Sequence, residues 1–204
     1  MKTLRVLATS KNWINKTLKI LEDGGVVAFP TDTVYGVGVR AFDVDGIERL
    51  YAIKGRERSK AIAILIAEAS QLEQIAEADK TAQTLAKNFW PGPVTLVLPR
   101  KPQVPESLAQ GPTIGIRVPD HTVSRKLLAA AGPMAVTSAN LSGEKNTLDA
   151  DEVLAQLGGR IDLVIDGGQT PGNQPSTVVD LTGGEPKFLR IGSVSEADIL
   201  AALK

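Results

Sequence analysis

The stretch GGVVAFPTDTVYGVG, residues 24–38, contains the pattern from which the fold class is predicted. Before it, apolar side chains at positions 13, 14, 18 and 21 recur with the spacing of one helix face, and the pair Gly24-Gly25 ends that pattern. Within it, the apolar run VVAFPT at 26–31 predicts a short buried strand. A helix that leads at once into a buried strand is typical of α/β proteins.

The same alternation continues along the chain and then changes. Helices are expected at 45–53, 70–78, 80–90, 122–132 and 148–159, and strands at 61–66, 94–99, 113–119 and 134–139. Three strand candidates then follow closely, at 163–168, 176–182 and 186–192, before a last helix capped by Ser195. Alternation followed by clustered strands favours a mixed parallel and antiparallel sheet over a purely parallel one. No repeat or low-complexity linker divides residues 1–204, so one α/β domain is expected.

Composition excludes several kinds of chemistry. The chain has no cysteine and one histidine, His121, which removes thiolate nucleophiles, disulfides and His-rich metal centres. Lys plus Arg equals Asp plus Glu at 23 each, so general attraction to nucleic acid or membrane is not implied. The first residues lack a signal-peptide pattern, and 18 consecutive apolar residues occur nowhere, so we expect a soluble, cytoplasmic protein that makes no membrane contact.

Common catalytic and nucleotide-binding motifs are also missing. The chain contains no G-x-x-x-x-G-K-[ST] loop and no G-x-S-x-G elbow. The segment GVGVRA after Tyr35 lacks the third glycine of a dinucleotide fingerprint and does not open a helix. Any nucleotide site must therefore be built from other residues.

Residues 54–60 carry a cation at every second position: Lys54, Arg56, Arg58 and Lys60. Gly55 interrupts the preceding helical pattern, so this segment is expected to run extended, with all four cations on one face. Like charges on one face repel one another unless water or an anion lies among them. The segment is thus either a solvated surface strand or part of an anion site.

Polar side chains also follow, or alternate with, the apolar residues of several predicted strands. They are Thr31, Asp32, Thr33, Tyr35, Arg117, Thr137, Ser138, Asn140, Ser142, Ser176, Thr177 and Arg190. Each taken alone has a structural explanation, such as an Asx turn at 31–33, a helix cap or a surface position. Together, at strand ends where ligand crevices form, they indicate a pocket for a polyanion, and a nucleotide fits that description.

Six motifs occur in an order and spacing that resemble one known family. They are PTDTVYGVG, KGR, WPGPVTLVLP, IGIRVPDH, TSANLSG and STVVDL, from about Gly25 to Arg190. The sequence resembles the YrdC-like domain of threonylcarbamoyl-AMP synthases, in its short, single-domain form. The resemblance implies a twisted mixed sheet flanked by helices around a basic concave cavity. It also implies a reaction in which L-threonine, bicarbonate or CO2, and ATP give threonylcarbamoyl-AMP and pyrophosphate, for the modification of adenosine 37 in tRNA.

The resemblance further implies roles for individual residues, with Mg²⁺ accompanying ATP. At the threonine end it implies Thr33, Arg117 and Ser176. Along the ATP phosphates it implies Lys54, Arg56 and Lys60, with Lys54 and Arg56 catalytic. Lining the nucleotide it implies Thr113, Ser138, Asn140, Asn146 and Arg190.

Two positions depart from the family pattern. Glu57 follows the KGR unit where proline is frequent, and Leu65 stands where longer members carry a histidine at the end of a strand. His121 falls within a family motif, but its place between a strand and a helix favours a structural role.

Two other functions remain open from the sequence. The same basic concavity would suit a non-catalytic module that binds double-stranded RNA or tRNA, although zero net charge and few aromatic residues argue against it. The second open function is that of a paralogue, a chain with the same fold and another activity. As a synthase it would depend on separate machinery to transfer the threonylcarbamoyl group to tRNA.

Overall fold

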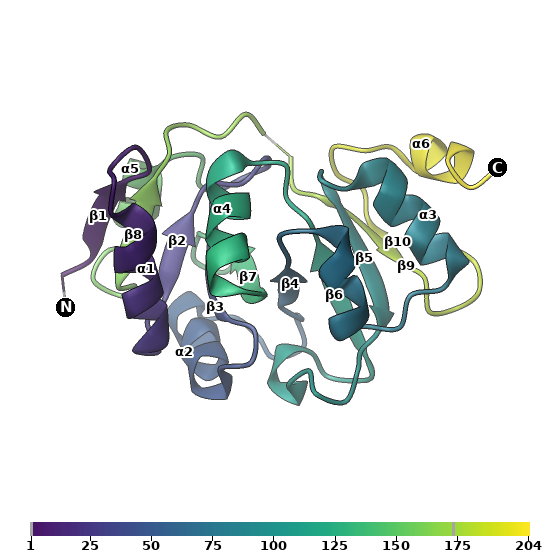
Figure 1. Ribbon diagram of the computed structural model, residues 1–204, viewed down its shortest axis with the longest axis horizontal. Helices are drawn as coiled ribbons and strands as arrows, with labels where there is room; N and C mark the ends of the chain where they lie inside the picture. Colours follow the sequence, from purple (N-terminus) through teal and green to yellow (C-terminus); the bar gives the residue numbers. More distant parts are fainter. Residues whose placement is uncertain (1, 173) are drawn as a thin grey trace.

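The computed structural model describes residues 2–172 and 174–204, and their strands form one ten-stranded sheet (Figure 1). The strands are β1 (Leu4–Leu7), β2 (Val27–Phe29), β3 (Gly36–Arg40), β4 (Ala63–Leu65), β5 (Val94–Pro99), β6 (Thr113–Arg117), β7 (Met134–Ser138), β8 (Leu163–Asp166), β9 (Thr177–Asp180) and β10 (Lys187–Arg190). Their order in the sheet is β1-β8-β2-β3-β7-β4-β6-β5-β9-β10.

The sheet is mixed, as predicted. Strand β8 pairs in parallel with β1 and β2, β4 with β6, and β5 with β9. The remaining neighbours pair antiparallel, including β3 with β7 and β5 with β6. Segments far apart in sequence therefore lie side by side, and side chains from many parts of the chain reach one region.

The helices are α1 (Trp13–Glu22), α2 (Val44–Lys54), α3 (Lys80–Phe89), α4 (Thr122–Ala131), α5 (Ala150–Leu157) and α6 (Glu196–Ala201), with 3₁₀ turns η1 (Ala69–Gln74) and η2 (Glu106–Leu108). Side-chain caps begin several of them: Asp43, Asp79, Asp149 and Ser195 each accept a backbone N–H of the first turn. The α-helix expected at 70–78 is corrected to the shorter 3₁₀ helix η1, which begins with a capping box between Glu68 and Gln71 and stays short, as 3₁₀ segments usually do.

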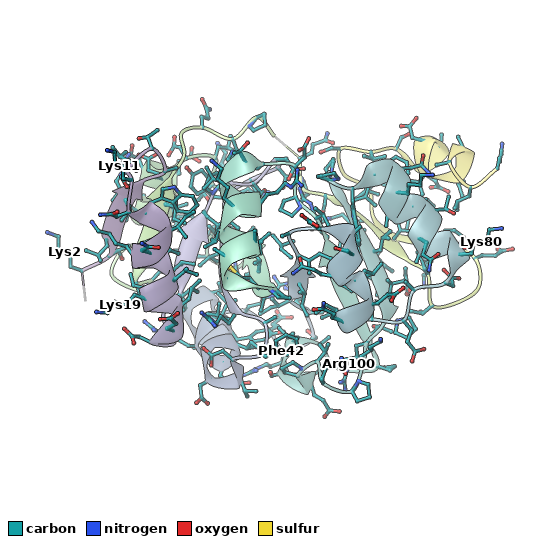
Figure 2. All side chains as sticks on the ribbon, viewed as in Figure 1. Lys2, Lys11, Lys19, Phe42, Lys80 and Arg100 are labelled. Atoms are coloured by element: carbon teal, nitrogen blue, oxygen red, sulfur yellow. The ribbon has the colours of Figure 1, made fainter. Side chains whose placement is uncertain are left out.

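Strand β1 was not predicted. Its sequence, LRVL, buries only Val6, while Leu4 and Leu7 are exposed on an edge strand, so the apolar pattern that marks a buried strand is absent. Lys2, Lys11 and Lys19 project from this end of the molecule, which carries β1 and α1 (Figure 2). None of the helices in the described ranges is long and apolar enough to cross a membrane.

Two apolar clusters pack on the sheet. One includes Ile64, Leu96 and Ile116 together with residues of α2 and α3. The other includes Phe29, Leu65, Met134 and residues of α1 and α4. These two helices lie side by side over the half of the sheet that contains β8, β2 and β7 (Figure 1).

One part of the sheet face is built from small side chains. Because side chains alternate along a strand, the residues next to Ile64, Leu96 and Ile116 point to the opposite face. Three of these neighbours are small, namely Ala63, Thr95 and Gly115, and a Cβ added to Gly115 would lie 3.2 Å from Thr95 Cγ2 and 3.5 Å from Ala63 Cβ. Ala63 and Gly115 are only partly buried, so the small side chains leave space above β4, β5 and β6.

Candidate active site

A pocket of about 100 Å³ lies where these small residues meet the turn between β2 and β3. It is lined by Thr31, Thr33, Val34, Tyr35, Gly36, Ala63, Leu65, Thr95, Arg117, Val136, Thr137, Ser138 and Ser176. The three residues that the sequence placed at one end of a site, Thr33, Arg117 and Ser176, therefore share one pocket. They come from a turn, from the end of β6 and from the residue before β9.

The turn that carries Thr33 is held by its neighbours. Thr31 Oγ1 accepts the Thr33 N–H at 3.2 Å and donates to the Val34 carbonyl at 2.7 Å. The bond that closes the turn is thus made by a threonine hydroxyl and not by Asp32, which leaves that carboxylate available for other contacts. Gly172 packs so closely that an added Cβ would lie 2.4 Å from the Thr33 carbonyl oxygen.

Arg117 is held in place by three contacts. Its Nε donates to the Gly92 carbonyl at 2.9 Å, its Nη1 to Thr33 Oγ1 at 3.1 Å, and its Nη2 to Asp32 Oδ1. The Arg117 side chain is 7% exposed and that of Asp32 is 11% exposed, so this ion pair is largely removed from water. Burial lowers the pKa of Arg117, and the neighbouring Asp32 opposes that shift.

Ser176 and Arg190 are joined directly. The Ser176 hydroxyl lies 2.8 Å from Thr95 Oγ1 and accepts from Arg190 Nη2 at 3.0 Å, while Arg190 Nε donates to the Ser176 carbonyl at 2.9 Å. Arg190 thereby reaches the edge of the pocket from β10, even though β10 is an outer strand.

Lys54 is buried and bonds to the backbone. It is the last residue of α2, is 2% exposed, and its Nζ donates to the carbonyls of Ser138 and Asn140. Burial, with a smaller contribution from the charge of Arg56, lowers the pKa of Lys54 to about 7. Lys54 therefore fastens the loop after β7 and leaves one of its three N–H bonds for another partner.

The predicted row of four cations on one extended face is wrong. Helix α2 continues to Lys54, Gly55 turns the chain with φ of 59°, and residues 56–61 form an irregular loop. Arg56 donates to the carbonyls of Lys60 and Ala61, both at 2.9 Å. The other two cations lie at the surface.

Those two cations have acidic partners. Arg58 pairs with Glu48 and lies over the Tyr51 ring at 4.5 Å. Lys60 is exposed and pairs with Glu57 at 3.5 Å. Neither side chain lines the pocket.

The remaining predicted nucleotide residues lie at different distances from the pocket. Ser138 lines it, and Asn140, 6% exposed, bonds through Nδ2 to the carbonyls of Leu141 and Glu144. Asn140 Oδ1 is buried without a partner among the described residues. Thr113 points to the same face as Arg117 but lies about 13 Å away along β6. Asn146 is half-buried in the loop between β7 and α5, and neither residue lines the pocket.

The electrostatics of the site favour an anion. Burial lowers the pKa of Arg190, and the charges of Arg117 and Arg56 lower it further, so the three guanidinium groups act on a common region. Over the described residues, no group of three or more His, Cys, Asp or Glu side chains is placed to hold a metal ion. The arrangement can neutralise and orient an anionic ligand.

Two pocket features were not foreseen from the sequence. Thr95 lies in the apolar run VTLVLP, where only the alternation of the strand shows that it faces the opposite side from Val94 and Leu96. Asp32 was noted as a turn residue, but its pairing with Arg117 joins positions 85 apart, which no local pattern reveals.

The structure also places Leu65 and His121, which the sequence analysis left off the site. Leu65 is buried in the pocket wall. His121 caps α4, with its Nδ1 accepting the Val123 N–H at 3.2 Å, in agreement with a structural role.

Comparison with known proteins identifies a family and several relatives to which the chain is similar. The family model that covers Sua5, YciO and YrdC, described as "Telomere recombination", matches residues 19–192. Threonylcarbamoyl-AMP synthases of Pyrococcus abyssi and Bacillus subtilis are 41% and 39% identical over 88% and 97% of this chain. The solved structure of P. abyssi Sua5 complexed with L-threonine is 37% identical, with a TM-score of 0.94 over 100% of this chain and 61% of that one. The chain spans 54% and 58% of the two curated relatives.

Proposed function

The chain belongs to the Sua5, YciO and YrdC family, and from this premise we propose that it is a threonylcarbamoyl-AMP synthase. The observation that carries the proposal is the pocket shared by Thr33, Arg117 and Ser176, with Arg190 bonded to Ser176 at its edge. Such a pocket offers hydroxyls and a guanidinium for a small carboxylate, next to further cations for phosphates. The P. abyssi relative solved with L-threonine supports threonine as that small ligand.

At the threonine end, Arg117 receives the substrate carboxylate and the hydroxyls of Thr33 and Ser176 receive the side-chain hydroxyl. An arginine fork matches a carboxylate in two bonds. The apolar wall formed by Leu65 and Val136 suits the substrate methyl group. Leu65 places an apolar side chain in the wall at the position where longer members carry a histidine.

At the ATP end, Lys54, Arg56 and Arg190 neutralise the phosphates. Ser138 and Asn140, whose carbonyls accept from Lys54, would contact the nucleotide. Thr113 and Asn146 would contact it further from the pocket, and Lys60 would lie at the outer end of the phosphates. Only one N–H of Lys54 is left for ATP, so Lys54 supports the site as much as it binds the ligand.

The chemistry has two steps. The threonine amine attacks the carbon of CO2, loses a proton and becomes a carbamate. A carbamate oxygen then attacks the α-phosphorus of ATP, and the bond from that phosphorus to the bridging oxygen breaks to release pyrophosphate. Both reactants are anionic, so positioning and charge neutralisation by the arginines supply the acceleration.

Magnesium enters as part of the substrate, MgATP. Phosphate oxygens and water would coordinate the ion, which would neutralise part of the phosphate charge. The product would pass to separate machinery that modifies tRNA, so a cytoplasmic location and a contact with tRNA belong to the same proposal.

The test is incubation with ATP, L-threonine and bicarbonate, followed by measurement of pyrophosphate. We expect release that requires threonine. RNA binding without threonine-dependent release would favour the RNA-binding module, and release that depends on another acceptor would favour a paralogue with a different activity.

A further inference from the structure

The carboxylate of Asp32 neutralises the charge of Arg117 within the protein itself, without a ligand. Of the five N–H groups of a guanidinium, Arg117 gives one to Gly92, one to Thr33 and one to Asp32, which leaves two for a ligand. Because both side chains of the pair are about nine-tenths buried, the carboxylate acts on Arg117 with little screening by water.

The other oxygen of Asp32 argues against a purely structural role. Asp32 Oδ2 is buried and has no hydrogen-bond partner among the described residues. A buried polar atom without a partner costs stability, so it calls for an explanation beyond the fold. The rigid turn formed by Thr31 and Thr33 nevertheless holds Asp32 in this place.

The surrounding charges suggest that explanation. Arg117 lines the pocket, so without Asp32 its positive charge would face the ligand space without the carboxylate that now pairs with it. Such a pocket attracts multiply charged anions most strongly, because the attraction grows with ligand charge. With Asp32 present, the Arg117 end is close to neutral and the excess positive charge remains at Arg56 and Arg190.

We propose that Asp32 is a positioning residue that makes Arg117 selective for a singly charged carboxylate over phosphate anions. This inference rests on the proposed function, since it assigns Arg117 to the amino-acid substrate. Asp32 thereby keeps inorganic phosphate, pyrophosphate and a misplaced triphosphate away from the amino-acid end of the site.

The test replaces Asp32 by its uncharged isostere, Asp32→Asn, with Asp120→Asn as the matched control. Asp120 is an exposed carboxylate three residues after Arg117. Inorganic phosphate is titrated into each protein by calorimetry, and its inhibition of threonine-dependent pyrophosphate release is measured. For Asp32→Asn we expect phosphate to bind about tenfold more tightly and to compete with threonine, while the KM for ATP changes less than about twofold. The control should behave like the wild type.

Unchanged phosphate affinity in folded Asp32→Asn would overturn the proposal. The wild type provides a second test that needs no variant: phosphate should compete with ATP and not with threonine, and competition with threonine would also overturn it. The calorimetric comparison does not depend on turnover. If the wild type released no pyrophosphate, the proposed function would fail, while the effect of Asp32 on anion selectivity would still be measured.

Discussion

Arg190 and Ser176 form a two-point contact between neighbouring strands: the guanidinium donates to both the carbonyl and the hydroxyl oxygen of the serine. The hydroxyl also lies 2.8 Å from Thr95 Oγ1. Because Ser176 has one hydroxyl hydrogen, it cannot donate to Thr95 and to a ligand together. If a ligand accepts a hydrogen bond from the Ser176 hydroxyl, Thr95 must be the donor in its contact with Ser176.

This contact predicts that Ser176→Ala weakens the binding of both substrates, threonine and ATP. Loss of the hydroxyl removes a proposed threonine contact and frees one arm of Arg190, and a hydrogen bond to a charged group contributes about 1.5–3 kcal/mol. The KM values for threonine and for ATP should both rise. The control is Ser193→Ala, an exposed serine nearby, which should change neither. A rise in the threonine KM alone would show that Arg190 does not depend on Ser176.

Arg117→Lys should impair threonine binding more than ATP binding. A lysine ammonium cannot reproduce the three fixed contacts to Gly92, Thr33 and Asp32 and still present two N–H groups to a carboxylate. Calorimetry with each substrate checks this. Threonine affinity equal to that of the wild type would remove Arg117 from the amino-acid site.

Arg56→Ala and Arg58→Ala should differ in their effect on ATP affinity. In the proposed site Arg56 contacts the ATP phosphates, so its loss should weaken ATP binding by about 1.5–3 kcal/mol. Arg58 is engaged with Glu48 and Tyr51 at the surface, so its loss should have little effect. ATP titrations of both variants provide the comparison. Equal effects would mean that the loop binds ATP as a whole and not through Arg56.

ATP binding should weaken as the pH rises above about 7. Burial lowers the pKa of Lys54 from 10.5 to about 7, so its protonated fraction falls across this range, and only the protonated form attracts phosphate. Binding of ATP should therefore be accompanied by proton uptake near pH 7–8, measurable by calorimetry in buffers of different ionisation enthalpy. Lys54→Met should bind weakly at every pH and take up no proton. Wild-type binding without proton uptake would contradict the prediction.

The amino-acid preference should be threonine, then serine, then valine. A pocket that pairs with a hydroxyl rejects an analogue without it by up to about 10⁴-fold, whereas loss of one methyl group costs about 1 kcal/mol. All four residues that would read the side chain line the pocket: in the proposed site Thr33 and Ser176 would pair with the hydroxyl, and Leu65 and Val136 would contact the methyl group. Pyrophosphate release with each amino acid gives the order. Valine equal to threonine would exclude a pocket that recognises the hydroxyl.

The elements of the fold were largely predictable because their signals are local. Helical spacing from Trp13, the glycine pair at 24–25 and the cap at Ser195 all correspond to observed boundaries. Strand β1 was missed because an edge strand with exposed Leu4 and Leu7 has no buried apolar pattern. The segment after Gly55 was assigned wrongly because alternating cations do not distinguish an extended strand from the irregular loop that forms, in which Arg56 donates to the carbonyls of Lys60 and Ala61.

The sequence indicated part of the residue set and none of its network of contacts. Thr33, Arg117, Ser138 and Ser176 line one pocket. The other residues expected at the site do not line it: Lys54, Arg56, Lys60, Thr113, Asn140, Asn146 and Arg190. The contacts of Lys54 with the carbonyls of Ser138 and Asn140 join positions more than 80 apart in sequence. Such pairings are set by the order of strands in the sheet, which periodicity does not contain.

That order of strands also determines when the site comes into existence. Strand β2 needs β8, some 135 residues later, as one of its neighbours, and Ser176 and Arg190 arrive only with β9 and β10. Pairing over such separations is slow, because the chain must close long loops before the contacts form. During synthesis, Thr33 and Arg117 leave the ribosome well before their partners at the other side of the pocket. The nascent chain is therefore expected to stay inactive, with unpaired strand edges that chaperones recognise, until the segment through Arg190 has emerged.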